Sequence, residues 1–420
     1  MTTKTNIQAG YKDSSVGVIP QEWEVKRLAE LCQNTGDYGI NAPAVPYRED
    51  LPTYLRITDI DSWGKFIKTD KASVDNPNSS QFILREGDIV FARTGATVGK
   101  TYLYDSKDRQ LVFAGFLIRF TPNSNKAVPY YIKACTETAS YWNWVRVISQ
   151  RSGQPGINSV EYGAMKLAVP PMEEQRKIAE ILGVWDEAIE KQSRLIEKLE
   201  LRKRGLMQRL FAGRMRIPGF NTPWQKVKLG EICKKVTRRN EENCQNVMTI
   251  SAKRGFVCQT DFFNKSVASS ILDNYYLVLK NEFCYNKSYS NGYPMGAIKR
   301  LKETEKAVVT TLYICFSVAD SKRLNINFFE QYCEYGGLNR GLSKVANEGG
   351  RSHGLLNVTP SDFFGLKLLL PSNEEQKAIA EVLATADYEI VAHRKKLDSL
   401  RKQKRALMQQ LLTGKIRVKI

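Results

Sequence analysis

The sequence predicts an α+β protein in which two mixed α/β domains are joined by two long α-helices, arranged as a pseudo-twofold internal repeat. The segments 170–217 and 371–418 are identical at 19 of 48 positions, with a constant offset of 201 residues. At the same offset, Trp23 falls on Trp224. Self-similarity of this kind indicates that the 420-residue chain consists of two related halves.

We therefore expect five segments. The first domain spans 1–170, the first long helix 171–213, the second domain 214–371, the second long helix 372–414 and a C-terminal tail 415–420. A chain of this length is sufficient for at least two domains, each with a core of its own.

Both long helices carry apolar residues that alternate by four and by three positions, which is the pattern of a coiled-coil seam. Pro171 and Ser372 mark the helix starts, and Gly213 and Gly414 follow their last apolar residues. The expected seam residues are Ile178, Leu182, Trp185, Ile189, Ile196, Leu199, Leu206, Leu210, Ile379, Leu383, Ile390, Leu397, Leu400, Leu407 and Leu411.

Polar residues interrupt the two seams at equivalent places. Gln192 corresponds to His393, and Lys203 to Lys404. Polar seam residues weaken a coiled coil but select its register and its partner, so we interpret His393 as a seam residue rather than a ligand. Because a domain separates the helices, pairing within the chain would be antiparallel. Pairing between two chains is the alternative.

Five apolar or β-branched runs predict strands in the two domains. They are Tyr54–Ile60, Ile89–Ala92, Leu111–Phe120, Tyr275–Leu279 and Val308–Val318.

The chain is strongly basic, with 63 Lys and Arg against 44 Asp and Glu and a formal net charge of +19. Such a charge favours a polyanionic partner, which includes nucleic acid, a membrane surface or an acidic protein. No run approaches 18 apolar residues, and the first residues lack the apolar core of a signal peptide. We expect a soluble, cytoplasmic protein with no membrane association.

Residue patterns of catalysis and of cofactor or metal binding are missing. Eight cysteines form no Cys-x-x-Cys pair, and there are only two histidines. The segment 95–101 resembles a P-loop but has three residues between its glycines instead of four. No Asn/Asp-Pro-Pro-aromatic motif occurs, and isolated acid-x-Lys triplets lack a convincing second acid. We therefore expect no catalytic residues, no cofactor and no metal, although an enzyme with an unrecognised site is an alternative.

Basic, amide and aromatic residues are interleaved in turn-rich segments of both domains. Arg and Lys can bind guanine edges, Asn and Gln adenine edges, and Thr or Tyr phosphate. The candidate DNA contacts are Arg93, Thr94, Lys100, Tyr102, Gln150, Arg151, Gln154, Asn158, Asn286, Lys287, Tyr289, Asn291, Tyr293, Lys299, Arg351 and His353.

Four motifs, in this order, resemble the specificity (S) subunit of type I restriction-modification systems. They are Gly-Val-Ile-Pro at 17–20 followed by Trp23, Gly-Asp-Ile-Val-Phe-Ala-Arg-Thr-Gly-Ala-Thr-Val-Gly-Lys at 87–100, Asn-Lys-Ser-Tyr-Ser-Asn-Gly-Tyr at 286–293, and the twice-used Pro-x-x-Glu-Glu-Gln-x-x-Ile-Ala-Glu. The resemblance covers essentially the whole chain.

This resemblance implies a non-catalytic subunit that binds double-stranded DNA. Two target recognition domains would each read one part of a bipartite asymmetric site, held apart by the paired helices. Two methyltransferase (M) subunits would dock on the chain, and restriction (R) subunits would join through the complex. The S subunit itself would bind neither S-adenosylmethionine nor ATP. A two-headed scaffold that binds other proteins through its variable domains is the alternative.

Overall fold

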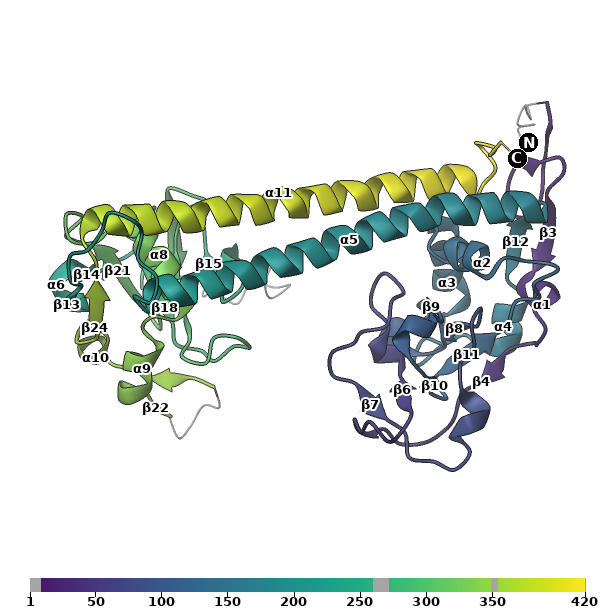
Figure 1. Cartoon of the computed structure of the whole chain (residues 1–420), viewed down its shortest axis with the longest axis horizontal. Coiled ribbons are helices and arrows are strands. Elements are labelled where there is room, and N and C mark those ends of the chain that lie inside the picture. The colour runs from purple at the N-terminus through teal and green to yellow at the C-terminus, as the bar shows by residue number, and fades with distance from the viewer. Residues whose placement is uncertain (1–8, 260–271, 349–353, 420) are drawn as a thin grey trace. The chain divides into compact units, whose positions relative to one another are not determined.

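The computed structural model describes residues 9–259, 272–348 and 354–419, except for the side chains of 347 and 348. Contacts divide the chain into two compact units. Unit 1 comprises 1–193 with 395–420, and unit 2 comprises 194–394. Helices α5 (Met172–Phe211) and α11 (Asn373–Leu411) are each continuous (Figure 1). Both helices cross a unit boundary, so each unit contains one mixed α/β domain and a part of each long helix.

The domain of unit 1 is built around an antiparallel four-stranded sheet of order β4-β11-β8-β9 (Asp37–Tyr38, Leu117–Phe120, Ile89–Ala92, Thr101–Leu103). A second sheet has the order β10-β6-β7-β5 (Leu111–Phe113, Thr53–Leu55, Ala72–Ser73, Val45–Pro46), and its β10 and β6 are parallel. Two-stranded sheets join β1 to β2 (Tyr11–Lys12, Ile19–Pro20) and β3 to β12 (Glu24–Arg27, Lys166–Val169). The short helices are α1 (Leu28–Leu31), α2 (Pro129–Cys135), α3 (Ala139–Ile148), α4 (Ser159–Gly163) and the 3-10 turns Ile57–Asp59, Ser79–Phe82, Gly95–Thr97 and Ser106–Asp108.

The domain of unit 2 also contains an antiparallel four-stranded sheet, of order β14-β21-β18-β19 (Cys233–Lys235, Ile314–Val318, Phe283–Asn286, Ala297–Arg300). Two-stranded pairs are β13 with β24 (Gln225–Lys228, Lys367–Leu370), β15 with β16 (Met248–Ser251, Gly255–Cys258), β17 with β20 (Tyr276–Leu279, Lys306–Val309) and β22 with β23 (Asn347–Glu348, Leu356–Asn357). Its short helices are α6 (Leu229–Ile232), α8 (Ile326–Tyr335), α9 (Asn339–Val345) and α10 (Pro360–Phe364).

The two four-stranded sheets have equivalent strand orders. In each domain an edge strand is followed later by an antiparallel hairpin, then by one strand that pairs outside the sheet, and then by the strand that returns between edge and hairpin. The outside strand differs, because β10 is parallel to β6 whereas β20 is antiparallel to β17. The two domains therefore have central sheets of the same topology and differ in the strands that surround them.

Three of the predicted strands are wrong in part. Strand β6 ends at Leu55, and a 3-10 turn at Ile57–Asp59 replaces the rest of the run Tyr54–Ile60. The runs Leu111–Phe120 and Val308–Val318 are not single strands, because a turn divides each of them into β10 and β11 or β20 and β21. In the first run, Gly115 donates its backbone N–H to Ile40 of another segment, 2.8 Å away, which takes the chain out of the strand direction.

Each domain core is completed by both long helices. In unit 1 the buried Trp23 and Leu28 share a cluster with Ile178 of α5 and Leu411 of α11. In unit 2 the corresponding cluster includes Leu229, Leu210 of α5, and Ile379 and Leu383 of α11. The beginning of one helix and the end of the other thus lie in the same core, and neither domain can bury its apolar surface without both of them.

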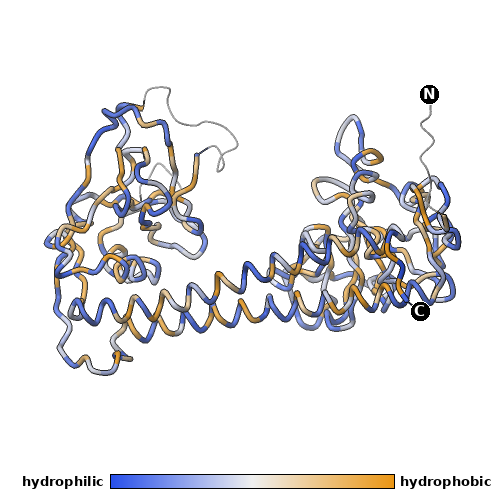
Figure 2. Tube along the Cα trace, turned by 90° about the horizontal axis from the view of Figure 1, so that it is seen from above, coloured by the Kyte–Doolittle hydropathy of each residue, from blue (hydrophilic) through white to orange (hydrophobic). Residues whose placement is uncertain are grey.

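None of the expected seam residues is exposed. Ile178, Leu182, Ile196, Leu199, Leu210, Ile379, Leu383, Ile390, Leu397 and Leu411 are buried, while Trp185, Ile189, Leu206, Leu400 and Leu407 are half-buried. Hydropathy accordingly alternates along both helices with each turn (Figure 2). His393 is half-buried and Gln192 is buried.

The lysines that interrupt the seams each bind a carboxylate of the other helix. In unit 1, Lys404 Nζ lies 2.8 Å from Asp186 Oδ1 and 3.4 Å from Glu137 Oε2. In unit 2, Lys203 Nζ lies 2.6 Å from Asp387 Oδ1. Because the 201-residue offset carries Lys203 onto Lys404 and Asp186 onto Asp387, the two ion pairs are the same contact made reciprocally.

The Glu-Glu-Gln motif at the start of each long helix makes a second reciprocal contact. Glu174, 1% exposed as a side chain, accepts from Arg417 Nε at 2.7 Å and from Trp23 Nε1 at 2.9 Å. Glu375 accepts in the same way from Arg216 Nε at 2.6 Å. Arg216 and Arg417 are also one repeat apart, so each helix start is held by the segment that follows the end of the other helix.

The glutamine of the motif ties the helix to the domain that precedes it. Gln175 Oε1 accepts the backbone N–H of Val128 at 2.9 Å, and Gln376 Oε1 accepts that of Asn325 at 2.8 Å. Both glutamines are at most 1% exposed. Buried polar groups need such partners, which explains why the motif occurs twice.

In the described part of the chain, no helix has the length and apolar character needed to cross a bilayer.

We predict that Lys404→Met lowers the free energy of unfolding by about 2 kcal/mol at pH 7, because Asp186 and Glu137 lose a partner in a largely buried setting. Urea denaturation measures this change. Lys402→Met, an exposed position on the same helix, serves as the matched control and should change stability by less than about 0.5 kcal/mol.

The destabilisation caused by Lys404→Met should be smaller at acidic pH. Burial raises the pKa of Glu137, but Lys133 and Lys404 outweigh it and hold that pKa below its ordinary value of 4.5. A lowered carboxyl pKa contributes stability above the unfolded pKa, which is lost as the pH falls through the folded pKa. A Lys404→Met deficit that is as large at pH 3.5 as at pH 7 would contradict this role of the lysine.

Candidate nucleic-acid interface

Arg93 directly follows the central strand β8 and is the strongest candidate contact in unit 1. Its guanidinium lies over the Tyr38 ring, 4.9 Å from the ring centroid. Its Nε is buried without a hydrogen-bond partner, and among the described residues Arg93 forms no ion pair with any acid of the structure. A positioned guanidinium with spare donors can bind a guanine edge or a phosphate.

The turn after Arg93 is built by backbone hydrogen bonds. The N–H of Gly95 donates to Pro155 O at 3.0 Å, and that of Gly99 to Ala92 O at 3.0 Å. Gly95 has a φ of +70°, and a Cβ there would meet Gln154 Nε2 at 2.9 Å, so this position requires glycine. These donors already have protein partners, which differs from a phosphate-cradling loop.

Arg93, Thr94 and Gln154 are brought together by this turn. Thr94 is bridged to Gly156, and Gln154 is exposed beside Gly95. These three side chains come from two sequence segments and form a single surface, which we call the unit 1 surface.

Other candidates of this domain have structural partners. Tyr102 is 1% exposed and donates to Asp108 Oδ2 at 2.9 Å; burial and this carboxylate raise the pKa of its hydroxyl. The Lys100 ammonium binds Ile60 O at 2.8 Å. Tyr102 therefore belongs to the core, and its placement argues against a DNA contact because aromatic residue type alone does not indicate exposure.

Of the candidates around α4, two have structural partners and one is exposed. Arg151 pairs with both carboxylate oxygens of Glu161, at 2.6 and 2.7 Å. Asn158 Oδ1 accepts the Glu161 N–H at 2.9 Å and caps α4. Gln150 is exposed. Arg151 and Asn158 thus stabilise the start of the helix, and Gln150 remains available.

In unit 2 the candidates Asn286, Lys287 and Asn291 line one open groove of about 580 Å³. Asn286 Nδ2 donates to Ile250 O at 3.1 Å and so joins the groove floor to β15. Tyr289 is 62% exposed in the same loop. We call these residues and their neighbours the unit 2 groove. Its full lining is Thr249–Arg254, Asn286–Ser288, Ser290, Asn291, Thr310, Leu312, Tyr313 and Leu355.

Sequence reasoning missed two basic residues of this groove, Lys253 and Arg254. They occupy the turn between β15 and β16. The only signal for them in the sequence is a Lys-Arg dipeptide before a glycine at 255.

Lys299 and Tyr293 form a closed network rather than a surface. Lys299 is 7% exposed, pairs with Glu334 and lies 4.8 Å from the Tyr293 ring centroid. Tyr293 donates to the same carboxylate at 3.1 Å, and burial together with Glu334 raises the pKa of its hydroxyl. The placement of Lys299 argues against a DNA contact because its charge is already neutralised. Arg351 and His353 lie outside the described residues.

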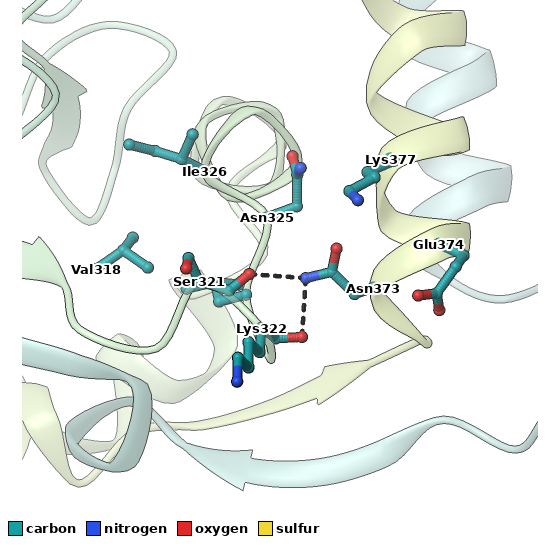
Figure 3. A pocket seen from close by; sticks show the side chains of 9 residues that line it. Val318, Ser321, Lys322, Asn325, Ile326, Asn373, Glu374 and Lys377 are labelled. Carbon is teal, nitrogen blue, oxygen red and sulfur yellow. Dashed lines mark hydrogen bonds between the residues drawn. The ribbon is translucent and has the colours of Figure 1, made fainter.

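A second hollow of about 510 Å³ lies between the β21–α8 connection and the start of α11 (Figure 3). Asn373 Nδ2 donates to the carbonyl oxygens of Ser321 and Lys322, 2.9 Å from each. The ionisable side chains of its lining are Lys322, Lys377 and a single carboxylate, Glu374. This hollow presents no paired acid and base of the kind that hydrolysis requires.

The structure also shows what the cysteines do. Cys32 is buried, and burial raises the pKa of its thiol to about 12. Cys284 and Cys315 lie opposite each other on β18 and β21, with a sulfur–sulfur distance of 3.2 Å, and are fully buried. Buried protonated thiols are unreactive. Within the described residues, no group of three or more His, Cys, Asp or Glu side chains could hold a metal ion.

Comparison with known proteins shows which proteins this chain resembles. The model of the type I restriction modification DNA specificity domain matches residues 20–201. The MjaX specificity subunit of a type I restriction enzyme from Methanocaldococcus jannaschii is 27% identical, over 98% of this chain and 98% of its own length. The MjaVIII specificity subunit from the same organism is 23% identical, over 96% of this chain and 94% of its own.

A solved structure has the same fold. The S subunit of a type I restriction-modification system from M. genitalium aligns over 98% of this chain and 99% of its own length, with a TM-score of 0.54 and 15% sequence identity. Because the relatives match both halves of the chain, the similarity is not confined to one domain. This chain is therefore similar over nearly its whole length to type I restriction enzyme specificity subunits, and its residues 20–201 match the DNA specificity domain of these systems.

Proposed function

We propose that this chain is the sequence-specific DNA-binding subunit of a type I restriction-modification complex and carries no catalytic site of its own. Its two mixed α/β domains, 1–170 and 214–371, act as target recognition domains that each read one part of a bipartite, asymmetric site. The observation that carries the proposal is a shared sheet order with unlike side chains at the ends of the central strands, Arg93 after β8 and Asn286 with Lys287 at β18.

The chemistry of these residues suits base and phosphate contacts. The Arg93 guanidinium, held over the Tyr38 ring, can bind guanine O6 and N7, and Lys253, Arg254 and Lys287 give the unit 2 groove a positive charge against phosphate. Unlike side chains in equivalent frames read unlike base sequences, so the target is expected to be asymmetric.

We further propose that the long helices, 171–213 and 372–414, pair within the chain as an antiparallel coiled coil that sets the spacing between the two half-sites. The reciprocal pairs Lys404–Asp186 and Lys203–Asp387 support this pairing, because each joins the two helices at a polar seam position. Ion pairs of this kind select one register over others.

The partners follow from the family. The chain docks two M subunits, one for each copy of the repeated framework, and R subunits join through the complex. The repeated helix starts, held by Glu174 and Glu375, supply two equivalent frameworks for two equivalent partners.

A scaffold that binds proteins through the same domains is the competing function. Salt separates the two, because a DNA complex that neutralises many phosphates weakens log-linearly as salt concentration rises. Binding of the M-containing complex to its target duplex should therefore weaken by about 10³-fold or more between 50 and 200 mM salt. If the complex does not bind DNA, or if its affinity for DNA does not change with salt concentration, the proposed function is contradicted.

Arg93→Ala should weaken binding to the target duplex by about tenfold or more, because a guanidinium with spare donors loses its base or phosphate contact. Arg48→Ala is the matched control, since Arg48 is exposed and already paired with Asp50 at 2.5 Å. Titration of both variant complexes with target DNA measures the effect. Equal affinities for the two variants would remove Arg93 from the interface.

Insertion of one heptad into each helix, after Ser193 and after Arg394, should lengthen the spacer of the target and leave both half-sites unchanged. Seven residues add about 10 Å of helix, or about three base pairs. Sequencing of methylated sites in cells with the M subunit reports both quantities. Insertion into one helix alone is the control and should abolish methylation, because it misaligns the seam. Altered half-sites with an unchanged gap would refute the role of the helices.

A further inference from the structure

Two large apolar side chains stand out from the surface at equivalent turns. Phe116 is 57% exposed between β10 and β11, and Leu312 is 63% exposed between β20 and β21. Each turn leads into the strand that pairs with the central strand of its four-stranded sheet, β11 with β8 and β21 with β18.

Single exposed apolar residues are common and need no explanation by themselves. Here the same place is used in two domains whose surrounding sequences have diverged and whose outside strands pair in opposite senses. Each turn also interrupts a largely apolar run, 111–120 or 308–318, so that Phe116 and Leu312 are exposed while Leu117 and Ile314, close to them in sequence, are buried.

Both side chains lie beside the candidate contacts. Phe116 O accepts the backbone N–H of Arg93 at 3.0 Å, which places the two residues side by side in the chain fold. Leu312 lines the unit 2 groove together with Lys253 and Lys287. In both domains, an apolar side chain therefore neighbours the basic residue that follows the central strand.

Contacts with neighbouring segments fix the backbone of both turns. In unit 1, Gly115 donates to Ile40 O at 2.8 Å, and a Cβ on Gly39 would come within 2.3 Å of Ala114 O. In unit 2, the hydroxyl of Tyr313 lies 2.9 Å from that of Thr249 on β15. A side chain presented by a fixed backbone loses little freedom on binding, which favours its use in recognition.

We propose that Phe116 and Leu312 make the apolar base contact of their respective domains and are specificity-determining residues, one for each half of the target. This inference rests on the proposed DNA-binding function. Apolar side chains read the edges of bases in the major groove, above all the 5-methyl group of thymine, and the adjacent Arg93 or Lys287 provides the polar or phosphate contact. The different shapes of Phe and Leu suit different bases in the two halves.

The test compares Phe116→Ala, Leu312→Ala and a control, Leu369→Ala, each as the full chain in complex with M subunits. Leu369 is 53% exposed on β24 and provides the same substitution outside the turns. Binding is titrated with the target duplex, with a set of duplexes that carry each single base-pair change, and with a random-sequence duplex of equal length.

Each of the two turn variants should bind the target about tenfold more weakly, which is the usual effect of one lost base contact. Each should also lose discrimination at one position, in different halves for the two variants. Affinity for the random duplex and its salt dependence should stay unchanged, because apolar contacts release no counterions. Leu369→Ala should match the unaltered chain on every duplex.

Full discrimination at every position by both turn variants would overturn the inference. Equal weakening on target and random duplexes would overturn it as well, since that result denotes a general effect on fold or charge. Failure of the unaltered complex to distinguish target from random DNA would instead refute the proposed function itself.

Discussion

The structure depends on lysines placed in an apolar seam. Lys404, about 10% exposed as a side chain, can remain charged there only if a carboxylate of the other helix reaches it, and Asp186 does so at 2.8 Å. Lys203 and Asp387 impose the same requirement in unit 2. Apolar side chains alone are compatible with several registers of the two helices. A buried lysine is compatible only with the register that places a carboxylate beside it.

This constraint reaches the recognition surfaces through the domain cores. Glu174 and Gln175 are buried at the start of α5, where they bind Arg417 and the Val128 backbone, and their repeats do the same in unit 2. The ends of both helices are therefore part of each domain. The central sheets rest on this shared framework, and their strand ends carry the side chains that differ, so that one frame presents two unlike surfaces.

The parts that follow a local rule could be predicted from the sequence. The long helices are predicted by a 3.5-residue apolar spacing. The lysines that interrupt this spacing mark the positions of ion pairs, but the sequence does not show which carboxylates bind them. Strand β8 lies at Ile89–Ala92 as expected. Arg93 could be chosen because a basic residue and a glycine follow a buried strand, which indicates a turn at a sheet end.

The remaining site residues depend on three-dimensional packing that a linear pattern does not contain. Tyr102 and Lys299 have the residue types of DNA contacts. In the structure, however, the buried Tyr102 binds Asp108, six residues further along the chain, and the buried Lys299 binds Glu334, 35 residues further along. Phe116 and Leu312 show the opposite error, since an apolar run predicts burial and the turn exposes them. Lys253 and Arg254 join the groove only because β15 pairs with β16.

The central claim is that each domain reads its own half of one target while the shared framework sets the arrangement. Exchange of residues 33–168 for the same segment of a relative with a different target tests it most directly, because the segment begins after α1, ends within β12 and leaves α5 and α11 intact. Sequencing of methylated sites in cells with the M subunit should show one half of the target replaced and the other half and the spacer unchanged. Changes in both halves, or in the spacer, would contradict the account.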